Sequence, residues 1–170
     1  MDNKNYYNVN DLISQLEQQT RQWMQDKGIT EPVMVGIHTS GVWIAQELHK
    51  RLQLPEPLGE LNATFYRDDF DQVGLHHQNK PSHLPFDIRG RHVLLVDDVI
   101  YTGRTIRGAM NELFDFGRPA SITLLVLIAR GGRELPIEPQ VAVLHEEPGP
   151  GFRYELSGPE LLTLTLMAQA

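Results

Sequence analysis

Cysteine is absent from the sequence, which excludes disulfide bonds, a thiolate nucleophile and a cysteine-ligated zinc site. Long apolar runs are absent too: no stretch reaches the roughly 18 residues of a membrane-spanning helix, and the first residues, Met1 to Tyr6, lack the apolar centre of a signal peptide. Positive charge is scarce, because 15 Lys and Arg face 22 Asp and Glu and leave a net charge of −7. That balance argues against broad affinity for nucleic acids. We therefore expect a cytoplasmic protein without a membrane segment.

The 170 residues, 41% of them hydrophobic, suffice for one sizeable core and predict a single domain over residues 1–170. Apolar residues at helical spacing predict three helices, which end near residues 28, 52 and 117. Continuous apolar runs predict buried strands at residues 33–38, 93–96 and 122–128. Because strands and helices alternate, the sequence predicts an α/β fold with a central, mostly parallel sheet flanked by helices.

The stretch between the second helix and the strand at 93–96 has a different character. Alternation at Leu61, Ala63 and Phe65 predicts another strand. The pattern then dissolves into polar residues, which predicts a long loop at about residues 66–88. A polar loop of this length is consistent with a mobile lid over a bound substrate.

The last part of the chain gives weaker signals. Short strands are predicted at 141–144 and 152–156, separated by a turn rich in proline and glycine. At 162–166 the signals conflict, because Pro159 can start a helix, whereas strict alternation with β-branched threonine favours a strand. We prefer the strand.

The most informative segment is Val93–Thr105, in which an apolar strand leads into two carboxylates and then into a small, hydroxyl-rich turn. Asp97 and Asp98 at a strand end can accept hydrogen bonds from vicinal ribose hydroxyls and help to hold a divalent cation. The following turn can offer backbone N–H groups, hydroxyls and the positive end of a helix dipole to a phosphate. Either half alone commonly serves only as a turn or a cap, but the two together predict a ribose 5-phosphate site.

These thirteen residues resemble the 5-phosphoribosyl 1-diphosphate binding motif of the type I phosphoribosyltransferases. The segment Val35–Gly41 resembles the pyrophosphate-binding loop of the same family, although small residues between a strand and a helix are by themselves a weak signal. Further segments, in the same order along the chain, are similar to one subfamily, the bifunctional pyrimidine operon regulatory proteins and uracil phosphoribosyltransferases. They are residues 59–69 with Tyr66-Arg67-Asp68-Asp69, residues 117–119, Arg130-Gly131, and residues 133–137.

The resemblance implies a role for each motif residue and a fold with a small hood from about residue 130 onward. Asp97 and Asp98 would bind the ribose hydroxyls and act in catalysis together with Arg67. At the root of the loop, Tyr66 and Arg67 would both bind substrate. The 5-phosphate would be bound by Val99, Ile100, Tyr101, Thr102, Gly103, Arg104 and Thr105. The pyrophosphate would be bound by Thr39, Ser40 and Gly41, and Arg130 would lie near the nucleobase.

The implied reaction joins uracil to 5-phosphoribosyl 1-diphosphate and yields uridine monophosphate (UMP) and pyrophosphate. It requires Mg²⁺ on the leaving group, positioned reactants and exclusion of water rather than a protein nucleophile. Asp97 would act on the magnesium ion through substrate hydroxyls or water. The expected ligands are uracil, 5-phosphoribosyl 1-diphosphate and uridine nucleotides, and the expected assembly is a homodimer or a higher homo-oligomer.

The chain departs from the family pattern at a few positions. Ser40 stands where a basic residue is usual, and Ala129 and Gly132 stand where the family typically has Asp and His. The first helix, a part of the surface that binds messenger RNA in the family, is poor in Lys and Arg, which phosphate binding needs. Two alternatives therefore stay open: a nucleotide-sensing regulator without turnover, and a purine-base phosphoribosyltransferase of the same fold.

Overall fold

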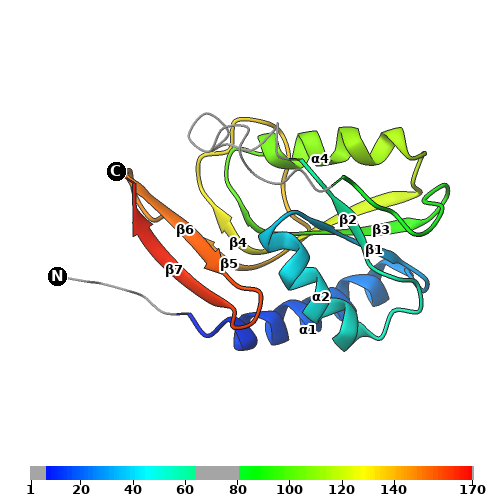
Figure 1. Cartoon of the computed structure of the whole chain (residues 1–170), viewed down its shortest axis with the longest axis horizontal. Coiled ribbons are helices and arrows are strands. Elements are labelled where there is room, and N and C mark those ends of the chain that lie inside the picture. The colour runs from blue at the N-terminus through cyan, green and yellow to red at the C-terminus, as the bar shows by residue number, and fades with distance from the viewer. Residues whose placement is uncertain (1–6, 64–80, 170) are drawn as a thin grey trace.

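The computed structural model of the protein describes residues 7–63 and 81–169. Five parallel strands form the central sheet, in the order β2-β1-β3-β4-β5. Two helices cover one face of this sheet and a third covers the other (Figure 1). The strands are β1 (Val33–Ile37), β2 (Gly59–Leu61), β3 (His92–Ile100), β4 (Ser121–Arg130) and β5 (Val141–Glu146), and the helices are α1 (Val9–Lys27), α2 (Ser40–Leu52) and α4 (Arg104–Asp115). The predicted α/β class is thus confirmed, with a fully parallel central sheet.

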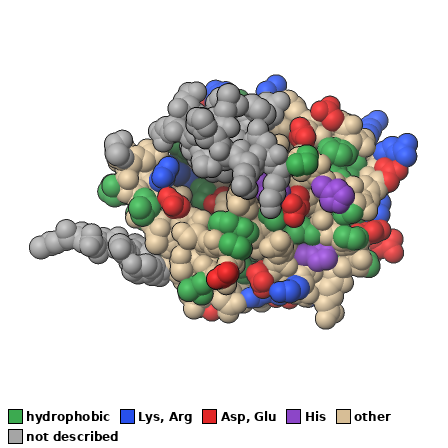
Figure 2. Space-filling view, viewed as in Figure 1, with side chains coloured by type: hydrophobic (Ala, Val, Ile, Leu, Met, Phe, Trp, Pro, Cys, Tyr) green, Lys and Arg blue, Asp and Glu red, His purple; other side chains and the backbone are tan. Residues whose placement is uncertain are grey.

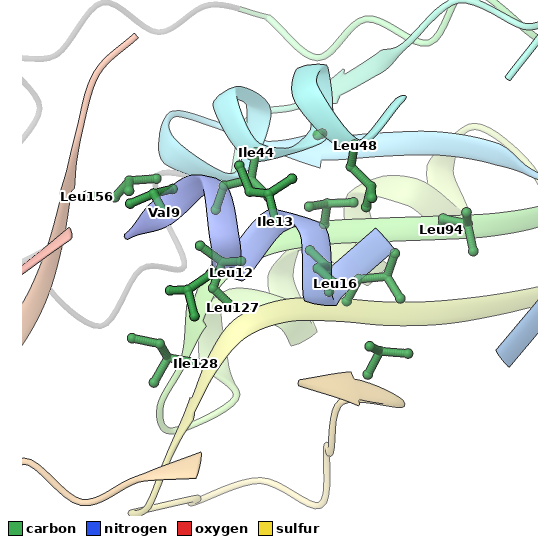
Figure 3. Packing of buried hydrophobic residues seen from close by; sticks show 14 of the residues in the cluster. Val9, Leu12, Ile13, Leu16, Ile44, Leu48, Leu94, Leu127, Ile128 and Leu156 are labelled. Carbon is green, nitrogen blue, oxygen red and sulfur yellow. The ribbon is translucent and has the colours of Figure 1, made fainter. Parts of the chain in front are cut away.

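Each face of the sheet carries its own hydrophobic core. On one face, Leu12 and Leu16 of α1 and Leu48 of α2 pack against residues of β3 and β4 such as Leu94 (Figure 3). On the other face, α4 packs through Ile106 and Leu113 onto Leu95 of β3 and its neighbours. The central strands are buried on both faces, which explains their continuous apolar runs. Among the described residues, no helix is both long enough and apolar enough to cross a membrane.

The ends of α1 follow ordinary capping chemistry. The side chain of Asn8 accepts a hydrogen bond from the N–H of Asp11, and Gly28 ends the helix with a positive φ of 66°. Both positions are typical of helix termini. The sequence prediction of this helix is therefore confirmed down to its closing glycine.

A separate two-stranded antiparallel sheet stands at one end of the molecule (Figure 1). It consists of β6 (Phe152–Ser157) and β7 (Thr163–Ala168), so the strand preferred over a helix at 162–166 is confirmed. The N-terminal segment joins this sheet through a bridge between Tyr7 and Leu164. After residue 130 the chain first adds β5 to the main sheet, and the separate sheet begins at β6. The hood expected from about residue 130 onward stays a prediction.

The strand predicted at Leu61–Phe65 corresponds to β2, which begins earlier, at Gly59, and ends at Leu61. Asn62 and Ala63 lie outside the strand, and residues 64 and 65 lie outside the described residues. Beyond it, the N–H of Asn62 donates to the Ser82 hydroxyl, which in turn donates to Glu112 of α4. His83 and Glu60 exchange backbone hydrogen bonds of 2.8 Å, and Ile88 is buried. Ser82, His83 and Ile88 of the loop expected at 66–88 thus contact the fold. Residues 66–80 lie outside the described residues, and the mobile lid stays a prediction.

Candidate active site

Asp97 and Asp98 lie near the carboxyl end of β3, the central strand of the sheet. Asp97 is only 6% exposed. Its Oδ1 accepts the N–H of Asp98 at 2.9 Å, and Oδ1 of Asp98 accepts the N–H of Val99 at 2.8 Å. These local bonds fix the orientation of both carboxylates. Both lie near the carboxyl ends of the parallel strands, where ligands bind in α/β folds of this kind.

The turn between β1 and α2 lies directly against this carboxylate pair. A Cβ atom on Gly41 would lie 2.7 Å from the carbonyl oxygen of Val96 and 3.0 Å from Oδ1 of Asp97. No side chain fits at such distances without displacing backbone. Thr39 is exposed and Ser40 is half-buried. The predicted pyrophosphate loop and the predicted ribose motif thus lie side by side.

The predicted phosphate loop follows β3 and leads into α4. Gly103 is the N-cap of this helix with a φ of 92°, and the hydroxyl of Thr102 accepts the N–H of Arg104 at 3.2 Å. The loop thus presents the N-terminal end of α4, where N–H groups and the helix dipole favour an anion. The Arg104 side chain instead pairs with Glu134 at 2.7 Å on the surface, so its backbone, rather than its guanidinium, is placed for phosphate.

Residues 133–137 pack behind the phosphate loop. The N–H groups of Glu134 and Leu135 both donate to the carbonyl of Thr102, at 2.9 and 3.1 Å. Arg133 donates to the carbonyl of Tyr101 and forms an ion pair of 2.9 Å with Glu138. The guanidinium of Arg133 holds the pKa of the Glu138 carboxyl below its usual value. This segment, recognised in the sequence only by resemblance, therefore serves to support the turn that would bind the 5-phosphate.

Arg130 and Tyr101 form a stacked pair at the same edge. Ile100 of β3 pairs with Ala129 of β4. The residues that follow them, Tyr101 and Arg130, therefore lie beside each other. The guanidinium of Arg130 lies 3.9 Å from the centre of the Tyr101 ring, and its Nη1 donates to the carbonyl of Phe152 in β6 at 2.9 Å. Arg130 thus links the phosphate loop to the two-stranded sheet.

Gly132 also packs closely against the Tyr101 ring. Its φ is 104°, and a Cβ atom there would lie 2.5 Å from Cε2 of Tyr101. Glycine is required at Gly132 for both reasons. The sequence offered no sign of this contact, because neither a positive φ nor a ring packed over backbone can be read from residue types.

Two further pairs at the carboxyl edge were missed by the sequence analysis. His38, at the end of β1, contacts Glu60 of β2 at 2.7 Å. Tyr7 donates to Glu146, at the end of β5, at 3.0 Å. Burial and the hydrogen bond to Glu146 raise the pKa of the Tyr7 hydroxyl, so Tyr7 stays a proton donor at neutral pH. Tyr66 and Arg67 lie outside the described residues, and their proposed roles stay predictions.

The side chains present at the site indicate how a magnesium ion would be bound. Among residues 7–63 and 81–169, no group of three His, Asp or Glu side chains is arranged to hold a metal ion. Asp97 and Asp98, neighbours in the sequence, nevertheless offer two carboxylates, and that of Asp97 lies beside the N-terminus of α2. This arrangement fits an ion that keeps several water and substrate oxygens as ligands and takes few from the protein, as Mg²⁺ does.

Comparisons with known proteins identify the family and the fold. The model of the phosphoribosyl transferase domain family matches residues 2–161. The bifunctional protein PyrR of Pseudomonas syringae pv. tomato is 50% identical over 159 residues, which cover 94% of each chain. The same-named protein of Nitrosococcus oceani is 47% identical over 161 residues, which cover 94% of this chain and 91% of that protein. The hypoxanthine phosphoribosyltransferase of Trypanosoma cruzi superposes with a TM-score of 0.66 at 17% identity, over 95% and 93% of the two chains, a likeness that shows the fold alone.

The fold, the carboxylate pair and the family match together define a type I phosphoribosyltransferase. The similarity to its relatives, close to half of all residues over more than nine-tenths of the chain, is more specific. The chain belongs to the PyrR family, the bifunctional pyrimidine regulators and uracil phosphoribosyltransferases that its motifs indicated.

Proposed function

We propose that this chain transfers the 5-phosphoribosyl group from 5-phosphoribosyl 1-diphosphate to uracil and that it responds to uridine nucleotides as a regulator of pyrimidine synthesis. One observation carries the proposal: three elements meet at the carboxyl ends of the central strands. They are the carboxylate pair Asp97-Asp98, the turn at Thr39–Gly41, and the start of α4 at Gly103. Each element fits one part of the substrate: the ribose hydroxyls, the diphosphate and the 5-phosphate.

The chain's own residues act by positioning and by charge. As pyrophosphate leaves the anomeric carbon, positive charge builds on the ribose ring, and the fixed carboxylates of Asp97 and Asp98 accept hydrogen bonds from its hydroxyls. The backbone of Tyr101–Thr105 anchors the far end of the sugar at the 5-phosphate. Bound magnesium would be held by diphosphate oxygens with Asp97 acting through hydroxyls or water, and it would neutralise the leaving group.

The nucleobase would lie near Arg130, between the end of β4 and the two-stranded sheet. This placement is supported by the stack of Arg130 on Tyr101 and by its bond to Phe152, which bring both sheets to one point. Tyr101 and Arg130 would thus connect phosphate binding to base binding. Uracil rather than a purine is favoured by the similarity to the PyrR relatives.

The contact between Gly132 and Tyr101 tests this placement. We expect Gly132→Ala to push the Tyr101 ring off Arg130 and to weaken UMP binding about tenfold, the value of one or two lost contacts. Calorimetric titration with UMP measures this. Gly149→Ala is the matched control, because Gly149 also has a positive φ of 83° but no atom within 4 Å of its added Cβ. If both variants bound UMP as tightly as the wild type, the assignment of Arg130 and Tyr101 to the base site would be wrong.

Binding to messenger RNA has less support than the transferase reaction. On the face shown in Figure 2, the Lys and Arg side chains of the described residues are interspersed with Asp and Glu. Arg21 and Arg51, on the exposed side of α1 and α2, already bond to Glu17 and Ser14 of the chain itself. Regulation by nucleotide sensing without tight RNA binding therefore fits the charge better. A homodimer or a higher assembly also stays a prediction.

The deciding experiment is base-dependent release of pyrophosphate. The purified protein, with magnesium and 5-phosphoribosyl 1-diphosphate, receives uracil, hypoxanthine or guanine. We expect release with uracil alone. Release with a purine would support the purine-base alternative. No release with any base, together with normal UMP binding, would support the nucleotide sensor without turnover. That alternative was kept open because Ser40 stands where the family usually has a basic residue.

A further inference from the structure

The two-stranded sheet of β6 and β7 is joined to the rest of the fold by contacts that the proposed reaction has not yet used. At one end of this sheet, Leu156 and Leu164 are buried in the core that also contains Val9 of α1 (Figure 3). At its other end, Phe152 and Met167 are 40% and 42% exposed. Apolar burial therefore anchors one end of the two-stranded sheet, and polar contacts decide where the exposed end lies.

Tyr7, just before α1, contacts three strands at once. Its backbone forms a bridge to Leu164 of β7, and its hydroxyl donates to Oε1 of Glu146, the last residue of β5, at 3.0 Å. Its ring centre lies 6.3 Å from that of Tyr154 in β6. Burial and the charge of Glu146 raise the pKa of the Tyr154 hydroxyl, so this hydroxyl stays protonated at neutral pH. Tyr7 thus connects both strands of the two-stranded sheet to the edge of the main sheet.

The end of β5 leads back to Arg130. Glu146 is the partner of Arg130 in the register between β5 and β4. Nη1 of Arg130 donates to the carbonyl of Phe152 in β6 at 2.9 Å, two residues before Tyr154. Together with the contacts of Tyr7, these contacts form a closed ring that runs from β5 to β4, from β4 to β6, and from β6 back to β5.

This ring of contacts sets the separation between β6 and the end of β4. The Arg130 side chain is long and has many rotamers, so its bond to Phe152 is compatible with a range of separations. Tyr7 has a rigid ring with two side-chain torsions, and its backbone is held on β7. Its bond to Glu146 therefore defines the separation more narrowly. The proposed position of the nucleobase lies between these same two elements.

We infer that Tyr7 and Glu146 are positioning residues for the nucleobase: their hydrogen bond holds the two-stranded sheet at the distance from β4 that the uracil ring fills. The inference rests on the proposed function, because it concerns the base of the same nucleotide. Loss of the bond would widen the base site and weaken the ligands that carry a base. Binding of the ribose and the 5-phosphate, which depends on residues 97–105, would be unaffected.

The test compares UMP with ribose 5-phosphate, which lacks the base. Tyr7→Phe removes one hydroxyl and keeps the ring near Tyr154. In calorimetric titrations, we expect Tyr7→Phe to bind UMP about tenfold more weakly, the equivalent of one hydrogen bond, and to bind ribose 5-phosphate like the wild type. In steady-state kinetics, the KM for uracil should rise about tenfold, while kcat and the KM for 5-phosphoribosyl 1-diphosphate change less than about twofold.

Variants of Glu146 test the same bond from β5. Glu146→Gln keeps an oxygen that can accept the Tyr7 hydroxyl and should bind UMP nearly as well as the wild type. Glu146→Leu removes the acceptor and should weaken UMP binding as Tyr7→Phe does. The two changes combined should lose no more affinity than the larger single loss, because both remove one bond.

Thr165→Val is the matched control. It removes a hydroxyl from β7 at nearly constant volume, and the bond of that hydroxyl, 3.5 Å to the carbonyl of Glu155, lies within the two-stranded sheet. Thr165→Val should therefore bind UMP and ribose 5-phosphate like the wild type. Thermal unfolding of each variant checks that the fold persists.

The outcomes distinguish the inference from the proposed function. Unchanged UMP affinity in Tyr7→Phe and Glu146→Leu, or an equal loss for UMP and ribose 5-phosphate, would overturn the positioning role. In that case a wild type that releases pyrophosphate with uracil would leave the proposed function intact. A wild type that binds UMP no more tightly than ribose 5-phosphate and releases no pyrophosphate with uracil would overturn both.

Discussion

Replacing Asp97 and Asp98 together with asparagine is expected to abolish measurable binding of 5-phosphoribosyl 1-diphosphate. The amide keeps the size of the carboxylate, and its oxygen can still accept the backbone N–H of Asp98 or Val99 that each carboxylate accepts now. What is lost is the negative charge that strengthens each hydrogen bond to a ribose hydroxyl. Because such bonds contribute about 1.5–3 kcal/mol each, the pair should cost a factor of at least about 100 in affinity.

Calorimetric titration with 5-phosphoribosyl 1-diphosphate and magnesium measures this loss. The matched control is Asp26→Asn with Asp115→Asn, which removes the same charge from two exposed positions near the carboxyl ends of α1 and α4. That control should bind like the wild type. If the Asp97 and Asp98 variant did so as well while remaining folded, the assignment of the ribose site would be wrong.

The central sheet could be predicted from the sequence because its strands are buried on both faces. Val93–Val96 and Leu124–Ile128 are apolar without interruption, as is typical of strands in a parallel sheet that is covered on both faces. The edge strand β2 was harder to delimit, since its neighbours Ala63 and Asn62 continue the alternation. The Asn62 N–H bonds instead to the distant Ser82 hydroxyl, so a tertiary contact rather than a local preference ends the strand.

The sequence predicted those parts of the candidate site that depend on residue type. It did not predict the contacts between residues that are distant in the sequence. Carboxylates and hydroxyls in a fixed order identify the ribose and phosphate motif. The stack of Arg130 on Tyr101 follows from the register between β3 and β4, and the contact of His38 with Glu60 follows from the pairing of β1 with β2. Neither register can be read from a single sequence, because periodicity gives the face of a strand but not its partner.

Gly41 shows how a residue without a side chain can be as important to the site as the carboxylates. The sequence placed it in a turn, where glycine is ordinary. The structure places its Cα where any Cβ would meet the Val96 carbonyl at 2.7 Å. The carbonyl belongs to the central strand and cannot yield, so the turn would have to move.

Gly41→Ala is therefore expected to lower kcat/KM for pyrophosphate release about 100-fold, because a displacement approaching 1 Å in a positioning group costs about that factor. The added methyl group would push the loop away from Asp97 and separate the diphosphate contacts from the ribose contacts. Steady-state kinetics with uracil measures the loss, and thermal unfolding checks that the fold persists. Gly28→Ala provides the comparison, since its positive φ of 66° makes alanine strained there but nothing lies within 4 Å of the added Cβ.

The two glycine variants should separate stability from catalysis. Gly28→Ala should cost about 1 kcal/mol of unfolding free energy and leave kcat/KM unchanged, because the C-terminus of α1 is remote from the carboxyl edge of the sheet. Gly41→Ala should keep UMP affinity close to that of the wild type, since UMP does not reach the pyrophosphate loop, while affinity for 5-phosphoribosyl 1-diphosphate falls. If Gly41→Ala weakened both ligands equally, the loop and the ribose motif would form one indivisible unit and the division of the site into pyrophosphate and ribose parts would have to be abandoned.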